Sequence, residues 1–276
     1  MVCRPGANGL HNGRGRMLLG VSLGHCHCHN CEVRHNVDKS NALLHGAQKR
    51  APRRRNRILE YQLYIRNRIP NLDGLPDPRL FAAHAPLVSL PRSVMRMGCK
   101  IVYVCRDPKD VLISHWNFVN KFRARDGLEA LSVETAADFF CDGVTLSGPY
   151  WDHVLGYWRA HQAHPQKVLF FRYEEMIGDP AAHVRKLAQF VGRPFCMEEE
   201  EAGAVEAIVR LCSFEHMTGL DVAKHGVTEL VVSMAENSWF FRRGQVGDWG
   251  NYLSRETARR IDAITEARFK GSGLRV

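Results

Sequence analysis

The sequence predicts an α/β fold in which helices flank a central parallel sheet. Ile101–Cys105 (IVYVC) is a continuous apolar run without strict alternation, as is typical of parallel strands buried on both faces, and Lys167–Phe171 (KVLFF) is a second candidate for a buried strand. Segments with helical spacing of apolar residues follow these runs. This alternation of short strands with longer helices favours βαβ units and a parallel sheet.

The other elements follow from apolar spacing and from end signals. After Ile101–Cys105, Asp107 is a plausible N-cap and Pro108 suits a first helical position, so we predict a helix to about Arg123. Leu80–Ala83 is a strand candidate that ends at His84. Helices are further expected over Ile58–Arg68, Ala136–Cys141, Tyr150–Ala163, Asp179–Val191, Glu198–Leu211 and Glu256–Phe269.

Charge and aromatic content divide the chain of 276 residues. Residues 1–57 hold 11 Lys/Arg and 2 Asp/Glu, which equals the net charge of +9, whereas the rest holds 27 of each sign. Residues 1–57 also contain no Phe, Tyr or Trp, so little apolar surface offsets the entropy of ordering them. We therefore expect a divergent, basic, poorly ordered segment over residues 1–57 and one large domain over residues 58–276.

Several features bear on compartment and partners. Nine cysteines without a paired framework favour a reducing compartment, the cytoplasm. No run of about 18 apolar residues predicts a membrane span, and Met17–Leu23 is too short for a convincing signal peptide. The cluster His25–Cys31 offers soft ligands, but no second pair completes a zinc site, so no metal is expected.

The stretch Ile101–Trp116 (IVYVCRDPKDVLISHW) has the features of a phosphate site. Arg106 leaves the carboxyl end of a buried strand, where α/β folds place their ligands, and Ser114 follows on the next helix. A guanidinium group offers two parallel donors to phosphate oxygens. The alternative is a surface ion pair between Arg106 and Asp107.

The stretch Phe241–Ser254 (FRRGQVGDWGNYLS) supplies a second set of phosphate ligands. Arg242 and Arg243 add positive charge, and Gly244 lets the backbone approach a phosphate closely. The alternative is a basic glycine turn around a buried Trp249.

Together the two stretches resemble the nucleotide-binding segments of cytosolic sulfotransferases, above all the plant enzymes, which use 3′-phosphoadenosine 5′-phosphosulfate (PAPS). The first fits the family pattern Arg-x7-Ser. The second fits R-[KR]-G-x-x-G-D-W-[KR]-N, with Gly250 replacing a basic residue. The resemblance covers about Ile58 to Phe269. It implies a P-loop-like three-layer fold, PAPS as co-substrate and PAP as product, and a 3′-phosphate held by Arg106, Ser114, Arg242, Arg243 and Gly244.

The resemblance also implies an adenine pocket. FFRYEEMIGDP places Tyr173 where the family has a tyrosine that hydrogen-bonds adenine. LCSFEHM matches the base-stacking loop, with Phe214 and Met217 as walls and Cys212 where many relatives have threonine. Ordinary core packing is the alternative for Tyr173, Phe214 and Met217.

RLFAAHAPLVSLP resembles the family segment R-[LIV]-[FIL]-x-T-H-x-P-x-x-x-L-P, which implies His84 as general base, with Ala83 in place of threonine. A histidine that titrates near neutrality suits proton removal from an attacking hydroxyl. The alternative is a structural histidine. His115, beside Ser114, is expected to be a packing residue.

One family segment has no counterpart in the sequence. The loop that holds the 5′-phosphosulfate, Y-P-K-[ST]-G-T-T-W, does not occur, although Met17–Gly24 is a candidate for the strand before it. Loss of such a donor costs about 10²–10³ in rate, so we expect an inactive or very slow chain.

The leading hypothesis is therefore a sulfotransferase that moves a sulfuryl group from PAPS to a hydroxyl of a small, largely apolar acceptor. The alternative is an impaired PAP- or PAPS-binding relative that acts as a sensor or partner. Nucleic-acid binding by residues 1–57 is a third hypothesis, with a steep salt dependence. Under the leading hypothesis the partner is a small-molecule acceptor, and neither a nucleic-acid nor a membrane partner is expected.

Overall fold

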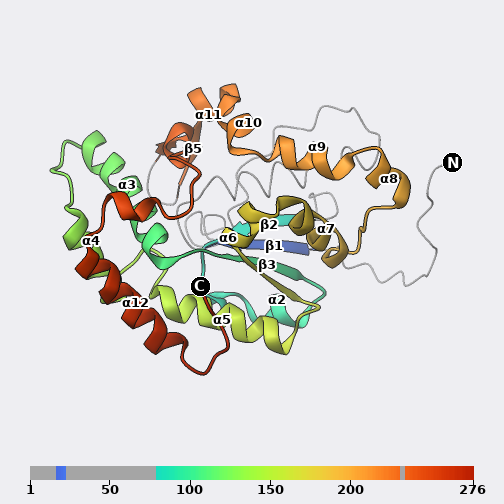
Figure 1. Ribbon diagram of the computed structural model, residues 1–276, viewed down its shortest axis with the longest axis horizontal. Coiled ribbons are helices and arrows are strands. Elements are labelled where there is room, and N and C mark those ends of the chain that lie inside the picture. The colour runs from blue at the N-terminus through green and yellow to red at the C-terminus, as the bar shows by residue number, and fades with distance from the viewer. Residues whose placement is uncertain (1–16, 23–78, 231–233) are drawn as a thin grey trace.

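A four-stranded parallel sheet forms the centre of the structure, a computed structural model that describes residues 17–22, 79–230 and 234–276 (Figure 1). Its strands are β1 (Met17–Ser22), β2 (Arg79–Ala83), β3 (Lys100–Cys105) and β4 (Val168–Arg172). Their order is β2-β1-β3-β4, and every pairing is parallel. The predicted α/β fold with a central parallel sheet is confirmed.

The strand β1 lies between β2 and β3. Val21 pairs with Ala83 on one side and with Tyr103 on the other. β1 falls within residues 1–57, so that segment contributes a strand to the sheet, and it matches the candidate strand Met17–Gly24. The boundary near Ile58, the helix expected over Ile58–Arg68 and the cluster His25–Cys31 lie outside the described residues.

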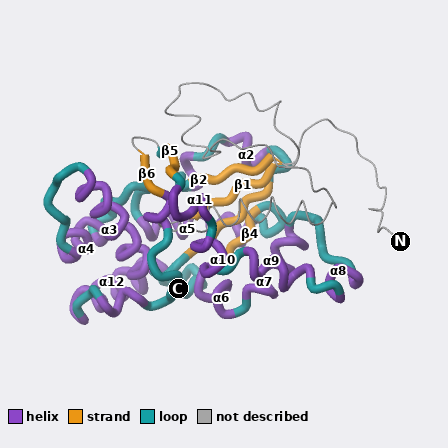
Figure 2. The backbone as a smooth tube through the Cα atoms, turned by 90° about the horizontal axis from the view of Figure 1, so that it is seen from above, coloured by secondary structure: helices purple, strands orange, loops and turns teal. Residues whose placement is uncertain are grey.

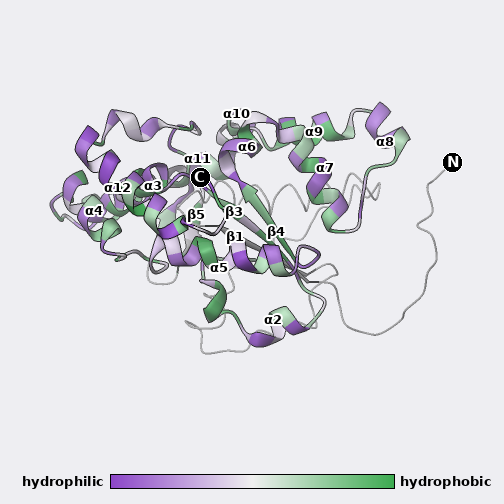
Figure 3. Ribbon diagram, turned by 60° about the horizontal axis from the view of Figure 1, so that its bottom comes forward, coloured by the Kyte–Doolittle hydropathy of each residue, from purple (hydrophilic) through white to green (hydrophobic). Residues whose placement is uncertain are grey.

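Both faces of the sheet are covered, which explains the continuous apolar runs. Ile101, Tyr103 and Cys105 of β3 point to one core, shared with α4 (Val133–Cys141), α5 (Tyr150–Ala163) and α12 (Arg255–Phe269). Val102 and Val104 point to the other, shared with α6 (Tyr173–Gly178) and α7 (Pro180–Phe190). Figure 3 shows β3 and β4 as hydrophobic along their length. The result is a three-layer arrangement of helices, sheet and helices.

The helices agree with most of the predicted ranges. The longer ones are α3 (Pro108–Arg125), α4 (Val133–Cys141), α5 (Tyr150–Ala163), α7 (Pro180–Phe190), α9 (Ala204–Leu211) and α12 (Arg255–Phe269). The shorter ones are α2 (Arg92–Arg96), α6 (Tyr173–Gly178), α8 (Met197–Glu201), α10 (Phe214–Gly219) and α11 (Asp221–His225). Short 3₁₀ turns cover Leu87–Ser89, Asn237–Phe240 and Asp248–Asn251.

The single helix predicted over Glu198–Leu211 was wrong. The structure has two helices, α8 and α9, and Gly203 between them has a left-handed backbone with φ of 73°. Only glycine adopts that conformation readily, and it ends a helix. A small antiparallel hairpin, β5 (Val227–Glu229) with β6 (Met234–Glu236), lies apart from the main sheet (Figure 2).

The sheet brings three predicted site residues to one edge. His84 follows β2, Arg106 follows β3 and Tyr173 follows β4. Because the strands are parallel, their carboxyl ends share this edge, which is where α/β folds bind ligands. In the part of the chain that the structure describes, no helix has the length and apolar character of a membrane span.

Candidate functional site

Arg106 lies at the turn between β3 and α3. Asp107 caps the helix by accepting from the backbone N–H of Lys109 at 2.7 Å and of Asp110 at 3.3 Å, and Pro108 occupies the first helical position, as predicted. The Arg106 carbonyl accepts from the Tyr150 hydroxyl at 2.6 Å. These bonds fix the backbone at and after Arg106, and the residue is only 6% exposed. The burial of Arg106 argues against the alternative of a surface ion pair with Asp107.

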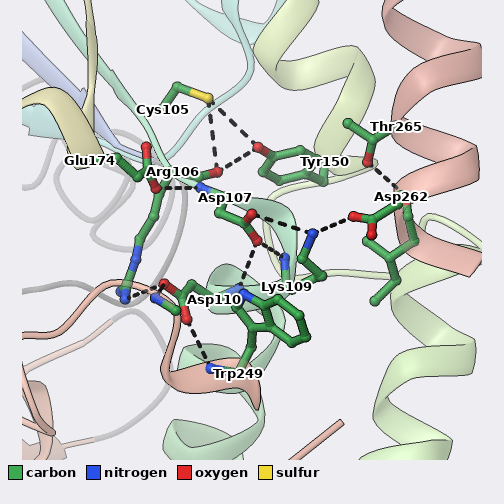
Figure 4. A network of polar contacts seen from close by, with 12 residues as sticks. Cys105, Arg106, Asp107, Lys109, Asp110, Tyr150, Glu174, Trp249, Asp262 and Thr265 are labelled. Atoms are coloured by element: carbon green, nitrogen blue, oxygen red, sulfur yellow. Dashed lines mark hydrogen bonds and ion pairs between the residues drawn. The ribbon is translucent and has the colours of Figure 1, made fainter. Parts of the chain in front are cut away.

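Asp110 joins the two motif stretches (Figure 4). Its fully buried carboxylate accepts from the Arg106 guanidinium at 3.2 Å. It also accepts from the backbone N–H groups of Gly247 at 2.8 Å and of Trp249 at 3.1 Å. Arg106 donates in addition to the carbonyl of Gln245 at 2.9 Å. The segments around residues 106 and 245, distant in sequence, are thus held side by side.

Asp248 orients the arginine pair of the second stretch. Its buried carboxylate accepts from Arg242 and, at 3.0 Å, from Arg243. Asn251 donates to the same carboxylate at 2.8 Å. The side chain of Arg242 is 19% exposed and that of Arg243 is 51% exposed, so Arg243 is the more accessible of the two.

Gly244 lies directly against the ring of Phe214. A Cβ atom at residue 244 would be 2.6 Å from Cδ2 of Phe214, and φ of Gly244 is +63°. Phe214 also meets Phe241 edge to face, with ring centroids 6.2 Å apart. The predicted adenine wall and the predicted phosphate loop are therefore neighbours, and only glycine permits the approach.

Tyr173 packs beneath the guanidinium of Arg106, whose Cζ lies 4.6 Å from the ring centroid. The tyrosine is 4% exposed and begins α6. Next to it, Glu174 accepts from the backbone N–H of Asp107 at 2.8 Å, which ties the end of β4 to the end of β3. Tyr173 is thus beside the predicted phosphate ligand.

The other predicted adenine residues lie around the start of α10. Cys212 follows α9 and is half-buried, Ser213 caps α10, and Met217 is 3% exposed one turn later. Ser114 is half-buried on α3. No hydrogen bond or ion pair joins Ser114 to the predicted phosphate ligands among the described residues, so its role stays a prediction.

His84 lies close to two other histidines, His115 and His153. Burial, with a smaller electrostatic contribution from the neighbouring His84, lowers the pKa of His115 to about 4. Burial also lowers the pKa of His153, on α5, to about 4. Both neighbours are therefore neutral at physiological pH. His115 is partly buried, in keeping with the predicted packing role, and it lies close to His84.

Two buried groups behind Arg106 support the site without entering its chemistry. Burial raises the pKa of the Cys105 thiol to about 12, so this cysteine is an unreactive core residue. Burial works against the charge of Lys109, but ion pairs with Asp262 and Asp107 outweigh it and raise the pKa of Lys109. Lys109 thereby links α3 to α12.

Sequence reasoning missed Asp110 and Asp248. Each lies within a quoted motif, but neither was assigned a role because the motif patterns drew attention to the cations. Asp110 lies four residues after Arg106 on the capped helix, a spacing that brings side chains together. That spacing was the available signal.

The fold is α/β with a parallel sheet, and the arginine-rich junction around Asp110 and Asp248 lies beside the carboxyl end of β3. A family model described as "Sulfotransferase domain" matches residues 25–273. The chain therefore belongs to the sulfotransferase family, as the motifs predicted.

Individual relatives agree with this membership. Cytosolic sulfotransferase 17 of Arabidopsis thaliana is 47% identical over 208 residues, covering 74% of this chain and 60% of that protein. Cytosolic sulfotransferase 8 of the same plant is 40% identical over 245 residues, covering 88% and 71%. The first of these matches thus spans about three-fifths of the relative's length.

Solved structures share the fold. An Arabidopsis thaliana putative steroid sulphotransferase has a TM-score of 0.62 and 31% identity, covering 95% of this chain and 78% of that one. Mouse sulfotransferase SULT7A1, solved as a complex with PAP, has a TM-score of 0.70 and 23% identity, covering 95% and 87%. At that identity the mouse protein supports the fold alone.

Proposed function

We propose that the chain is a PAPS-dependent sulfotransferase that transfers a sulfuryl group to a hydroxyl of a small, largely apolar acceptor in the cytoplasm. The observation that carries the proposal is the Asp110 junction, which places Arg106 beside the loop that bears Arg242 and Arg243. Motif residues far apart in sequence meet at the edge where such folds bind nucleotides.

The charges at this junction suit a 3′-phosphate. Three guanidinium groups, those of Arg106, Arg242 and Arg243, face the two carboxylates of Asp110 and Asp248. The side chain of Arg243 is half exposed, so its guanidinium is accessible to a phosphate monoester, which carries about −1.5 to −2. Ser114 and the N–H of Gly244 would complete the phosphate ligands.

The nucleoside would extend from the phosphate toward α10. Phe214 contacts Gly244 directly, so an adenine beside Phe214 lies next to a phosphate at Gly244. Tyr173, Cys212 and Met217 are the other proposed adenine residues.

The proposed reaction is an in-line displacement at sulfur. His84 takes the proton of the acceptor hydroxyl as the new bond forms between that oxygen and sulfur. The bond from sulfur to the bridging oxygen breaks, and PAP leaves with the electron pair. PAPS thus supplies the sulfuryl group.

Calorimetry with two nucleotides tests the phosphate site without an acceptor. PAP and adenosine 5′-phosphate differ only in the 3′-phosphate. We expect the wild type to bind PAP at least about 100-fold more tightly, since charge-assisted bonds contribute roughly 1.5–3 kcal/mol each. Arg243→Ala should reduce that preference at least about tenfold, because it removes one proposed ligand of the 3′-phosphate. The variant should still fold, since the side chain of Arg243 is half exposed and Asp248 keeps its bonds to Arg242 and Asn251.

The matched control is Arg268→Ala, which removes an exposed arginine paired with the exposed Asp152 at 3.6 Å. Its nucleotide preference should equal that of the wild type. Equal affinity of the wild type for the two nucleotides would contradict the proposed 3′-phosphate site.

A second candidate function is an impaired PAP- or PAPS-binding relative that acts as a sensor or partner. The observation that favours it is the absence of a K-[ST]-G-T-T-W string from the sequence. The strand β1 would precede such a loop, and the residues that follow it lie outside the described residues. Tight PAP binding without sulfuryl transfer to a broad acceptor panel would identify this function. Turnover after a K-[ST]-G-T-T-W loop is grafted behind β1 would support the family mechanism.

A further inference from the structure

The backbone at His84 is held by side chains of α5. Nε2 of His153 lies 3.0 Å from the carbonyl oxygen of His84. One helical turn later, the hydroxyl of Tyr157 donates to the carbonyl oxygen of Ala85 at 2.8 Å. His153 and Tyr157 are four residues apart and share a face of the helix. Two consecutive carbonyl groups are thus fixed by one helix.

The protonation state of His153 follows from these partners. A carbonyl oxygen only accepts, so Nε2 of His153 carries the proton and donates. His153 is 2% exposed and neutral, so its Nδ1 is an acceptor. The hydroxyl of Tyr103, 3.1 Å away, therefore donates to Nδ1. The chain of donors runs from Tyr103 through His153 to the backbone of His84.

This chain spans the sheet. Ala83 and Tyr103 both pair with Val21, so they lie in one row across β2, β1 and β3. The ring of Tyr103 also stacks on that of Tyr157, with centroids 4.3 Å apart and an interplanar angle of 15°. Through Tyr103 and His153, the end of β2 is fixed relative to β3, and Arg106 directly follows β3.

We propose that His153, Tyr157 and Tyr103 are positioning residues that hold the proposed base, His84, at a fixed place relative to the phosphate site. The inference rests on the proposed role of His84. His153 and Tyr157 act through the two backbone carbonyl groups, and Tyr103 acts through His153. A displacement of a reacting group by about 1 Å can lower a rate about 100-fold, so loss of these contacts should slow sulfuryl transfer and leave nucleotide affinity unchanged.

The experiment uses the full chain with labelled histidines. The ring signals of His84 are assigned by their loss in His84→Gln. In His153→Leu and in the milder Tyr157→Phe, we expect the His84 ring signals to move while PAP affinity stays within about twofold of wild type. His153→Gln retains an N–H donor and should restore the signals in part. Where turnover is measurable, kcat should fall about 100-fold in His153→Leu with KM for PAPS unchanged.

His161→Gln is the control, because His161 lies on the same helix and bonds another carbonyl, that of Val168, at 2.8 Å. It should leave the His84 signals unchanged. Unmoved His84 signals in both Tyr157→Phe and His153→Leu would overturn the inference. If His153→Leu fails to fold, Tyr157→Phe decides. If the wild type shows no turnover, the catalytic part of the proposed function fails, and the His84 signals still decide on positioning.

Discussion

Replacement of one carboxylate oxygen of Asp110 by an amide NH₂ group is the sharpest test of how the two motif stretches are joined. One carboxylate oxygen of Asp110 accepts from both Arg106 and Gly247, and the other accepts from Trp249. In Asp110→Asn, the single amide oxygen can take the place of only one of the two carboxylate oxygens. The better orientation keeps the hydrogen bonds from Arg106 and Gly247 and turns the NH₂ group toward the N–H of Trp249. The hydrogen bond from Trp249 is then lost, and two donors face each other.

The size of the effect follows from these bonds. A hydrogen bond to a charged group contributes about 1.5–3 kcal/mol, and a buried donor left without its acceptor costs about 1–3 kcal/mol. The two contributions overlap, so we expect the free energy of unfolding to fall by about 3 kcal/mol. Loosening of the loop that carries Arg242 and Arg243 should also weaken PAP binding about tenfold, which corresponds to 1.4 kcal/mol.

Urea unfolding and calorimetry with PAP measure the two effects on the same protein. The control is Asp126→Asn, which removes the charge of an exposed carboxylate paired with the adjacent Arg125. Ion pairs between exposed side chains contribute little to stability because water and salt screen them, so this variant should behave like the wild type. If Asp110→Asn unfolds within about 0.5 kcal/mol of the wild type and binds PAP equally well, the inferred junction is not what orders the loop.

Two further predictions follow from particular contacts. Gly244→Ala should lower the free energy of unfolding by about 2–3 kcal/mol and weaken PAP binding, because its Cβ would overlap the ring of Phe214. In the control Gly127→Ala, the glycine has a similar φ but open space around it, so the free energy of unfolding should fall by only about 1 kcal/mol. Equal losses for the two variants in urea unfolding would contradict the close approach of Gly244 to Phe214. The pKa of His153 is held near 4 in the fold, so the unfolded chain binds more protons below about pH 6.5. Stability should therefore fall as pH drops from about 6.5 to 4, by roughly 3 kcal/mol from this group, and a fluorescence-monitored unfolding series should show a shallower fall in His153→Gln; parallel curves for the two proteins would refute the buried neutral histidine.

Much of the chain's structure could be predicted because the signals are local. The cap at Asp107, Pro108 at the first helical position and the apolar run of β3 each act within a few residues. The split between α8 and α9 was missed, although its cause, Gly203, is visible in the sequence. Helical spacing on both sides outweighed a single glycine in the interpretation.

The residues that assemble the site could be only partly predicted. The arginines were found because their motifs are specific, whereas Asp110 and Asp248 were not. The sequence does not distinguish a carboxylate that faces solvent from one that accepts from a backbone N–H distant in the chain. His153 carried no motif signal, since its partner lies 69 residues away.

The sequence by itself determined the type of fold, the family and the cations available for an anion, because apolar periodicity, caps and motifs are properties of neighbouring residues. Only the tertiary structure decided that Gly244 contacts Phe214, that the carboxylate of Asp110 accepts from the N–H of Gly247, and that the carbonyl oxygen of His84 bonds to His153 of α5. These approaches depend on how strands and helices pack against one another across long separations, and no local pattern encodes such distances.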